Sequence, residues 1–399
     1  MDGYTSITPA LRLHAGEAAL DHLPQELRRL KAGRAFILCG QSVATRTDLL
    51  PRLRALLGEI YAGDYTRIGK DAPLADVKAA ALAAQGRQAD VLIAVGAGSV
   101  LKAARVVAIL IAEPGDPLSL ATQYIEGKAP YSPRLNQPKL PLINVLTAAT
   151  SAQHRAGAAL RVDDGGARLE YYDPKTRPAA IFWDKGALLT APPSLALSTG
   201  VGVFWRALMN AAVIRTANPL VQASRLQAFE LARRALPRLR DPAEVDARMD
   251  MCAAALLQNR DEDDGGRPFD AHWVARAVYA LGAALFNRVP HLDQGTTHAV
   301  LTAPAIRHFG DLCPDAMEEM GCRLGLPAAT AASPDKVAAE VYRIFQGVGL
   351  PDRLQSLAVS RADLEAALEA AMFNFNADRS RELRWHRDRL WAVLADAHE

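Results

Sequence analysis

The chain has 399 residues, of which 50% are hydrophobic and 23% are charged, a profile typical of a soluble globular protein with room for two domains. Its 46 Lys and Arg residues nearly balance 44 Asp and Glu residues. We therefore expect no broad basic surface and no nucleic-acid partner. The four cysteines form neither a CxxC pair nor a metal-ligand spacing, which suits a reducing compartment. The N-terminus lacks a signal-peptide pattern and no apolar stretch approaches the roughly 18 residues of a membrane span. These features predict a cytoplasmic protein with no membrane segment.

The first half of the chain alternates between strand-like and helix-like segments. Helical patterns occupy 45–60 and 73–88. The run DVLIAVG is apolar throughout, as is typical of a strand buried on both faces. The alternation predicts a parallel sheet with crossover helices. The strand candidates are 34–40, 64–69, 90–96, 140–147 and 178–184.

Beyond about residue 186 nearly every segment has helical periodicity and little β signal. The sequence therefore predicts an α/β domain over 1–186 and an all-helical domain over 187–399. The arginines of 225–240 are interpreted as a solvated helix face. The acidic stretch 260–268 is interpreted as a surface loop, because it lacks the glutamate that a calcium loop needs at its twelfth position.

A glycine-containing turn ends the apolar strand candidate and begins a helical pattern. Gly96 and Gly98 allow the backbone to approach a ligand closely, and the first N–H groups of the helix face outward with the positive end of its dipole. Ser99 adds a hydroxyl, while Lys102 and Arg105 add positive charge. This predicts an anion site. The turn matches neither GxGxxG nor a P-loop, so a tight turn without a ligand remains an alternative.

A second polar turn follows the strand candidate 140–147. The hydroxyls of Thr147, Thr150 and Ser151 lie in a Thr/Ser/Ala-rich stretch, NVLTAATSAQ. Ligands of open α/β sheets bind at the carboxyl ends of the strands. We therefore expect these hydroxyls to reach ribose or phosphate oxygens at the same edge of the sheet as the glycine turn.

Together these segments resemble the iron-containing alcohol dehydrogenase superfamily, especially its maleylacetate reductase branch. VLIAVGAGSVLKAARVVA is similar to the family's Gly-Gly-Gly-Ser-x-x-Asp-x-Ala-Lys turn, and NVLTAATSAQ to its Pro-Thr-Thr-x-x-Gly-Ser-Glu turn. Residues 181–200 resemble the segment that leads through Leu-Pro to Thr-Gly. Residues 288–309 resemble the stretch with Pro-His and then Thr-His-Ala-Val.

The resemblance implies a fold, a cofactor and an assembly. It implies a Rossmann-like dinucleotide-binding domain followed by a helical domain, the architecture shared with dehydroquinate synthase-like proteins, with an active-site cleft between the two. It also implies NAD(H) or NADP(H) as cofactor and a homodimer paired through the N-terminal sheet edge. In the nucleotide site the residues at matching places are Gly96, Gly98, Ser99, Thr147 and Ser151. The family's acidic residue is replaced by Lys102, which favours an anion.

The resemblance also implies where a metal would be bound. The family's first two ligands, an Asp and a His, correspond to Gly202 and Arg206, and a further pair of histidines corresponds to Ala275 and Tyr279. Among the ligand positions His291 alone is retained. One imidazole cannot hold a catalytic divalent ion, which needs about three protein ligands. We therefore expect no metal.

A reaction without a metal needs another source of positive charge at the developing alkoxide. Arg206 would supply a fixed charge, His291 would exchange a proton near neutral pH, and Tyr279 would relay a proton beside it. His298 is a second candidate acid. Each has a structural alternative: an interdomain salt bridge for Arg206, a half-buried core position for Tyr279, and a capping or packing role for His298.

Three functional hypotheses follow. The first is a metal-independent, NAD(P)H-dependent reductase of a small carbonyl compound, carboxylated ones included, similar to maleylacetate reductase. The second is a non-redox enzyme on the same fold, namely a hydrolase, C–C lyase, isomerase or cyclase. The third is a non-catalytic relative that binds a phosphorylated ligand or a protein. The glycine turn discriminates among them, because a reductase must keep it open for pyrophosphate while Lys102 and Arg105 could fold back and fill it.

Overall fold

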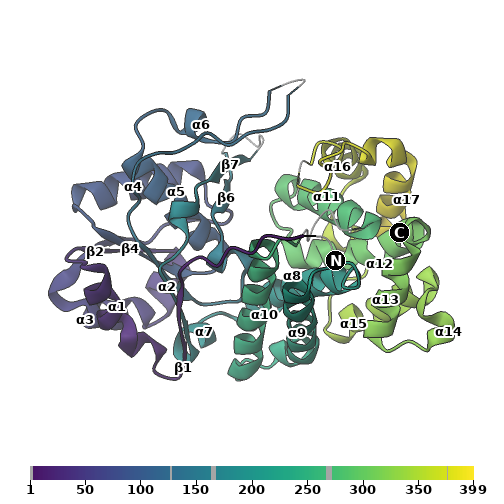
Figure 1. The fold of residues 1–399 in the computed structure, drawn as a ribbon, viewed down its shortest axis with the longest axis horizontal. Helices are drawn as coiled ribbons and strands as arrows, with labels where there is room; N and C mark the ends of the chain where they lie inside the picture. Colours follow the sequence, from purple (N-terminus) through teal and green to yellow (C-terminus); the bar gives the residue numbers. More distant parts are fainter. Residues whose placement is uncertain (1–2, 126–127, 163–167, 267–271, 375) are drawn as a thin grey trace. The chain divides into compact units, whose positions relative to one another are not determined.

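The computed structural model describes residues 3–125, 128–162, 168–266, 272–374 and 376–399. The chain forms two compact units (Figure 1). One is Pro9–Pro192, and the other is Pro193–Glu399 joined by the first residues of the chain up to Thr8. The N-terminal residues are held to the helical unit because Ser6 Oγ donates to Asp264 Oδ1 at 2.6 Å and Ile7 N–H to the Asp263 carbonyl at 2.9 Å. The division therefore falls a few residues beyond the predicted boundary at 186, and residues 3–8 group with the helices.

The first unit is built on a six-stranded sheet of order β1-β8-β5-β4-β2-β3, in which every neighbouring pair is parallel. A separate antiparallel hairpin lies beside α5. The strands of the main sheet are β1 (Arg12–Gly16), β2 (Ala35–Cys39), β3 (Tyr61–Tyr65), β4 (Val91–Gly96), β5 (Leu142–Leu146) and β8 (Ala180–Asp184). The hairpin is β6 (Gly157–Leu160) and β7 (Leu169–Tyr172).

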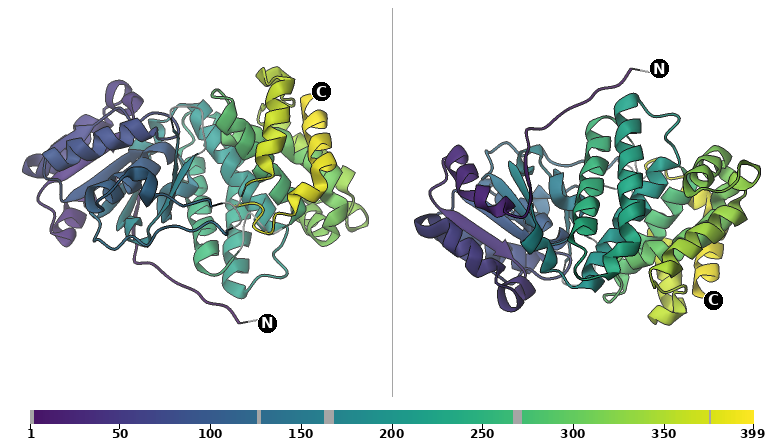
Figure 2. Two further views of the ribbon diagram at one scale, coloured as in Figure 1. Left: turned by 90° about the horizontal axis from the view of Figure 1, so that it is seen from above. Right: turned by 90° about the horizontal axis from the view of Figure 1, so that it is seen from below.

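Helices cover both faces of this sheet (Figure 2). On one face α1 (Leu23–Leu30) and α3 (Leu49–Leu57) pack their leucines against alternate strand residues such as Ile37, Ile93 and Ile143. On the other, α5 (Gly98–Ala112) contacts β4, β2 and β5, and α4 (Leu74–Gly86) packs beside it. Every residue of β2, β4, β5 and β8 is buried, which explains why these strands are apolar throughout. The shorter elements are η1 (Ala19–His22), α2 (Gln41–Arg46), η2 (Gly58–Ile60), α6 (Pro117–Leu120), η3 (Ser151–His154), η4 (Pro174–Thr176) and α7 (Lys185–Leu189).

The second unit consists of helices, with α12 in contact with α8, α11, α15 and α17. α8 and α12 approach closely because Gly295 has no side chain; a Cβ there would lie 2.0 Å from the Ser198 carbonyl oxygen. Asn218 and Asp293 accept backbone N–H bonds and so begin α9 and α12. The helices are α8 (Pro193–Ala211), α9 (Pro219–Ala235), α10 (Val245–Asp263), α11 (Trp273–Arg288), α12 (Gln294–Phe309), α13 (Pro314–Leu324), α14 (Ala328–Ala331), α15 (Pro334–Gly347), α16 (Arg361–Ala371) and α17 (Arg387–His398). The 3-10 turns are η5 (Leu236–Arg240), η6 (Gly310–Leu312), η7 (Gln355–Leu357) and η8 (Leu383–His386).

The predicted fold class is confirmed, and each of the five predicted strands has a counterpart in the main sheet. The strand expected at 64–69 begins earlier, as β3, and the helix expected at 45–60 is divided into α2 and α3. β1, β6 and β7 were not predicted.

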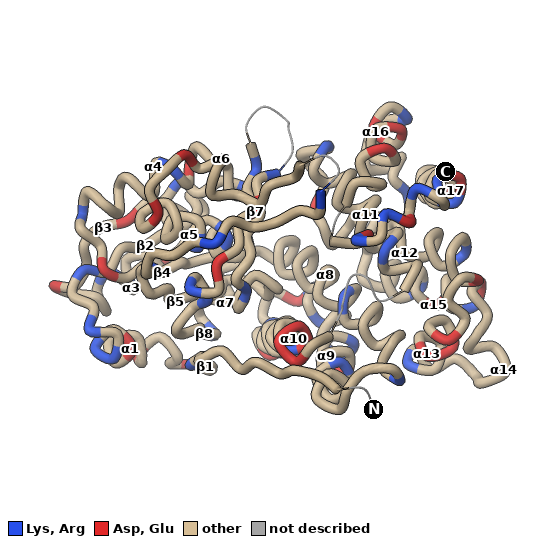
Figure 3. Tube along the Cα trace, turned by 45° about the horizontal axis from the view of Figure 1, so that its top comes forward, with Lys and Arg blue, Asp and Glu red and all other residues tan. Residues whose placement is uncertain are grey.

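One interpretation of a charged segment was wrong, and another holds only in part. Asp261, expected in a surface loop, lies in α10 with no exposed surface. Among the arginines of 225–240, Arg233, Arg234 and Arg240 are exposed as expected, whereas Arg225 is buried. The side chains of Asp261 and Arg225 form a bidentate ion pair, with Arg225 Nε donating to Asp261 Oδ2 at 2.7 Å. Residues 267 and 268 of the acidic stretch lie outside the described residues. Elsewhere basic and acidic residues are interspersed along both units (Figure 3). Among the helices in the described part of the chain, none has the length and apolar character needed to cross a membrane.

Candidate functional site

The two polar turns meet at the carboxyl ends of β4 and β5. The strands are direct neighbours, with Gly96 opposite Leu146, and Thr147 N–H donates to the Gly96 carbonyl at 3.1 Å. The turns also touch beyond the strands, because a Cβ on Gly98 would lie 3.2 Å from Thr150 Oγ1. The expectation that they lie at the same edge of the sheet is confirmed.

Gly96 is required by the turn itself. Its φ is +156°, and a Cβ at this position would lie 2.9 Å from Val100 Cγ2, within the first turn of α5. The glycine allows β4 to lead directly into α5, which places the helix start at the strand end. The first N–H groups of a helix have no partner within it and lie at the positive end of its dipole. The local geometry is therefore suited to an anion.

Two of the predicted hydroxyls already make hydrogen bonds within the chain. Ser99 Oγ accepts a bond from Asp71 N–H at 2.9 Å, and Thr150 Oγ1 accepts one from Ala152 N–H at 3.1 Å. Thr147 is buried, and Ser151 begins η3, where its carbonyl accepts from Arg155 Nε at 3.1 Å. A ligand at this edge would find Ser99 and Thr150 held in fixed orientations.

The two cations of α5 differ in what they do. Lys102 Nζ lies 3.6 Å from Asp71 Oδ1, and Arg168 Nη2 lies 3.4 Å from the same oxygen. Burial, with the nearby Arg168 charge, lowers the pKa of Lys102 to about 8. Asp71 and Arg168 were missed from the sequence, because nothing near them resembles a phosphate-binding motif.

Arg105 is a structural clamp. Its guanidinium donates to the carbonyls of Ala152, Arg155 and Gly157 at 2.7, 3.1 and 2.7 Å. Burial lowers its pKa to about 9. The side chain therefore holds the second polar turn and the start of β6, and the alternative that it folds back and fills the anion site is wrong.

In the helical unit, Arg206 lies on α8 with 3% of its surface exposed. Its Nη2 donates to Glu262 Oε1 at 2.6 Å and to the Gln258 carbonyl at 3.0 Å, both on α10. Glu262 belongs to the same unit as Arg206, so this ion pair is not the interdomain salt bridge that was the structural alternative. The guanidinium is a fixed and buried positive charge.

Tyr279 and His298 are close together, on α11 and α12. Their ring centroids are 6.0 Å apart, and the His298 ring lies 4.0 Å from that of Trp205. His298 has no exposed surface, and within the described residues neither of its ring nitrogens has a hydrogen-bond partner. Burial lowers its pKa to about 3. A histidine that stays neutral at physiological pH is unsuited to the predicted role of acid, so the packing alternative is favoured.

His291 lies after α11 and is exposed. Its Nε2 is 2.8 Å from the Leu357 carbonyl oxygen in η7. A carbonyl can only accept, so Nε2 carries the hydrogen and Nδ1 is left as the basic nitrogen of the neutral ring. The predicted active-site cleft between the units, and the grouping of His291 with Arg206 within it, stay predictions.

Comparison with known proteins assigns the family. The profile described as "Iron-containing alcohol dehydrogenase" matches residues 10–185, and "Fe-containing alcohol dehydrogenase family, C-terminal" matches residues 196–394. The chain belongs to the iron-containing alcohol dehydrogenase family. Its members are oxidoreductases, and so is this chain.

Individual relatives match over nearly the whole length. The chain is 24% identical to maleylacetate reductase of Pseudomonas aeruginosa, over 97% of this chain and 95% of that one. It is 22% identical to alcohol dehydrogenase 4 of Saccharomyces cerevisiae, over 96% of each. The crystal structure of sulfoacetaldehyde reductase from Bifidobacterium kashiwanohense in complex with NAD+ has a TM-score of 0.80 at 16% identity, covering 100% of this chain and 98% of that one. The resemblance to the maleylacetate reductase branch is confirmed.

The family implies a metal, and a catalytic divalent ion needs about three protein ligands. The resemblance assigns the family's ligand positions to Gly202, Arg206, Ala275 and Tyr279, beside His291. Two of these side chains have no donor atom, and Arg206 carries a buried positive charge. In the described part of the chain, no group of three or more His, Cys, Asp or Glu residues could hold a metal ion. This donor set does not fit a divalent ion.

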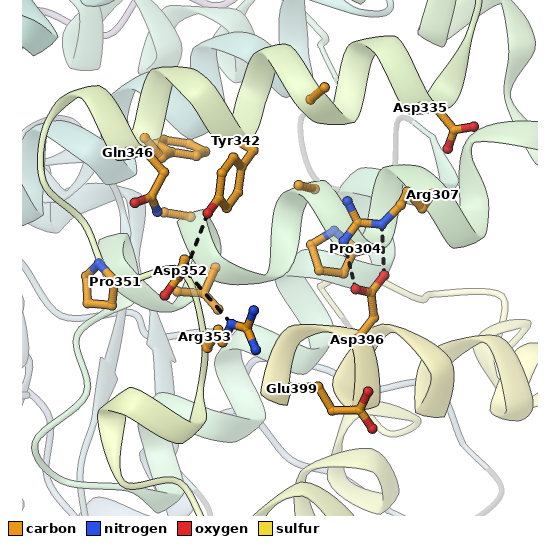
Figure 4. Close-up of a pocket in the computed structure, with 15 residues that line it drawn as sticks. Pro304, Arg307, Asp335, Tyr342, Gln346, Pro351, Asp352, Arg353, Asp396 and Glu399 are labelled. Atoms are coloured by element: carbon orange, nitrogen blue, oxygen red, sulfur yellow. Dashed lines mark hydrogen bonds and ion pairs between the residues drawn. The ribbon is translucent and has the colours of Figure 1, made fainter.

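A cavity of about 700 Å³ lies elsewhere in the helical unit, among α12, α15 and α17 (Figure 4). Its lining includes the bidentate pair of Arg307 with Asp396, at 2.7 and 2.9 Å, and Tyr342, whose hydroxyl donates to Asp352 at 3.4 Å. The sequence-predicted site residues are not among the residues that line it. Its charged groups largely pair with one another.

Proposed function

We propose that the chain is a metal-independent reductase that uses NAD(P)H to convert a small carbonyl compound into an alcohol. The observation that carries the proposal is the junction of the two polar turns at the start of α5, in a chain whose family profile covers both units. Bound at this edge, a nicotinamide cofactor would supply a hydride to the carbonyl carbon. The reaction balances as carbonyl, NAD(P)H and a proton giving an alcohol and NAD(P)+.

The chain itself must bind the cofactor phosphates and supply the proton. The first N–H groups of α5 and the hydroxyls of Ser99 and Thr150 would contact the phosphates. Arg206 offers a fixed charge for the developing alkoxide or a substrate carboxylate. We assign proton delivery to His291, whose Nδ1 would take up a proton from solvent and pass it to the developing alkoxide, with Tyr279 as relay.

Metal independence is supported by the types of residue at the positions assigned to the family's metal ligands. Arg206 is fixed by Glu262 and the Gln258 carbonyl, so its charge cannot easily turn away from an incoming cation. The test is to assay carbonyl reduction after extensive chelation, with metal content measured on the same sample. We expect unchanged activity. Activity that disappears with chelator and returns with Fe2+ or Zn2+ would overturn this part of the proposal.

The first experiment for the cofactor is titration of the chelated protein with NADH and NADPH, followed by tryptophan fluorescence. Saturable binding in the micromolar range is the expected result, and a screen of small keto acids, maleylacetate among them, would follow. No binding at millimolar nucleotide would contradict the reductase hypothesis.

A non-redox enzyme is the second candidate, and one observation favours it. The Asp71 carboxylate lies against Lys102 beside the glycine turn. This contact is expected if a side chain of the protein itself occupies part of the anion site. The nucleotide titration separates the two candidates. If neither nucleotide binds, chemistry should be sought around Arg206, Tyr279 and His291 with hydrolase, lyase or isomerase substrates, and a non-catalytic binding role remains if none reacts.

A further inference from the structure

The loop between β3 and α4 lies against the start of α5. Asp71 N–H donates to Ser99 Oγ at 2.9 Å, and Gly69 N–H donates to Asp76 Oδ2 at 2.9 Å. Ser99 is the second residue of α5. The loop therefore brings the acidic side chain of Asp71 to the start of α5, where the proposed function expects the cofactor phosphates to bind.

Asp71 is shared between two cations. Its Oδ1 lies 3.6 Å from Lys102 Nζ and 3.4 Å from Arg168 Nη2, and the three side chains are only 19–24% exposed. Long side chains on a helix lean toward its N-terminus, so the Lys102 ammonium is carried back toward Ser99. The Asp71 carboxylate thus faces two positive charges, those of Lys102 and Arg168. A phosphate group with more negative charge than a carboxylate is the better counter-ion for this pair.

The backbone of the loop is fixed independently of this carboxylate. Asp71 and Ala72 both have left-handed backbone conformations, with φ of +61° and +53°, which residues with a Cβ seldom adopt. Arg161 N–H donates to the carbonyls of Asp71 and Ala72 at 3.2 and 3.3 Å, and Leu74 N–H donates back to the Arg161 carbonyl at 2.9 Å. These bonds and the Ser99 contact use main-chain atoms of the loop. The carboxylate can therefore turn away from the cations while the loop stays in place.

We propose that the Asp71 carboxylate competes with the phosphate groups of the dinucleotide for Lys102 and Arg168, and thereby weakens nucleotide binding. Arg168 and Lys102 are then phosphate-binding residues of the same site, and Asp71 is the residue that sets its affinity. The proposal rests on the proposed function, since the competing ligand is the cofactor.

The test is Asp71→Asn in the full chain, which keeps the shape and every main-chain bond of the loop but removes the charge. Titration with NADH and NADPH should give a dissociation constant about three- to tenfold lower than in the unchanged protein, as expected for losing a competing ion pair of modest strength. Inorganic pyrophosphate should likewise become a stronger competitor. Lys102→Met and Arg168→Met should each weaken nucleotide binding.

The matched control is Glu59→Gln, which removes one exposed negative charge just before β3, at the opposite edge of the sheet. It should leave the affinity unchanged, which excludes a general effect of net charge. Nucleotide binding by both proteins with equal or weaker affinity in Asp71→Asn would overturn this inference alone. Absence of binding by both at millimolar nucleotide would overturn the proposed function, and this inference with it.

Discussion

At the scale of single residues, Arg206 is the side chain on which a reaction without a metal depends most. It is buried, and Glu262 and the Gln258 carbonyl fix its guanidinium. If its charge stabilises the alkoxide, Arg206→Ala should lower kcat by about 10²- to 10³-fold with a smaller effect on KM. Added guanidinium should restore part of the rate in the variant. Arg307→Ala, which breaks an ion pair of the distant cavity, should leave kcat unchanged. A loss of folding without rescue would mean that Arg206 serves structure only.

The burial of His298 leads to a prediction about how the stability of the fold depends on pH. Burial holds its pKa at about 3, below the value of 6.5 for an exposed histidine. Between these values the unfolded chain binds a proton that the folded chain does not, so stability is fully present above pH 6.5 and falls as the pH is lowered. The slope is about 1.4 kcal/mol per pH unit for one such group. His298→Phe keeps a ring against Trp205 and should flatten the loss of stability between pH 6.5 and 5 in denaturant titrations. An unchanged slope would contradict the burial of a neutral imidazole.

At the scale of elements, Arg105 couples α5 to the second polar turn. Replacing it by Met would leave the buried carbonyls of Ala152, Arg155 and Gly157 without their donor, at a cost of about 1–3 kcal/mol for each buried unsatisfied group. We expect faster hydrogen exchange in 147–160 and weaker nucleotide binding. Arg34→Met, which removes a bond to the Arg87 carbonyl at the other edge of the sheet, is the control and should leave exchange in 147–160 unchanged. Equal exchange in the Arg105 variant would show that the turn is held by other contacts.

The elements also show what the sequence can and cannot predict. β2, β4, β5 and β8 are buried on both faces, so their apolar runs identify them. β1 (RLHAG) lies at the sheet edge and is half exposed, and β6 and β7 are short, so none has such a run. The two polar turns were predictable because parallel strands bring their carboxyl ends to one edge.

The remaining site residues were not predictable, because their roles depend on contacts between distant parts of the chain. Asp71 meets Lys102 only once β3, α4 and α5 are packed, and Arg168 reaches it from the hairpin. The burial of His298 depends likewise on Trp205 from another helix. Residue type and spacing suggested an acid at His298, whereas its desolvation, which only the packing of α8, α11 and α12 shows, argues against one.

At the scale of the whole molecule, the edge strand β1 is where we expect two copies of the chain to pair in the predicted homodimer. Within the described residues β1 is paired to β8 only, so one side of its backbone is available to another strand. Leu13, on this strand, is an apolar side chain that is 39% exposed. Two copies joined along this edge would pair these backbone groups and cover Leu13.

We therefore expect light scattering after size-exclusion chromatography to give twice the mass of one chain. Leu13→Lys should shift the equilibrium toward the monomer, because an ammonium group in the contact would have to be desolvated. Leu82→Lys is the matched control, since Leu82 is 70% exposed on α4, away from this edge. It should remain dimeric. A monomeric unchanged protein would contradict the prediction, and a dimer that resists Leu13→Lys would place the interface elsewhere.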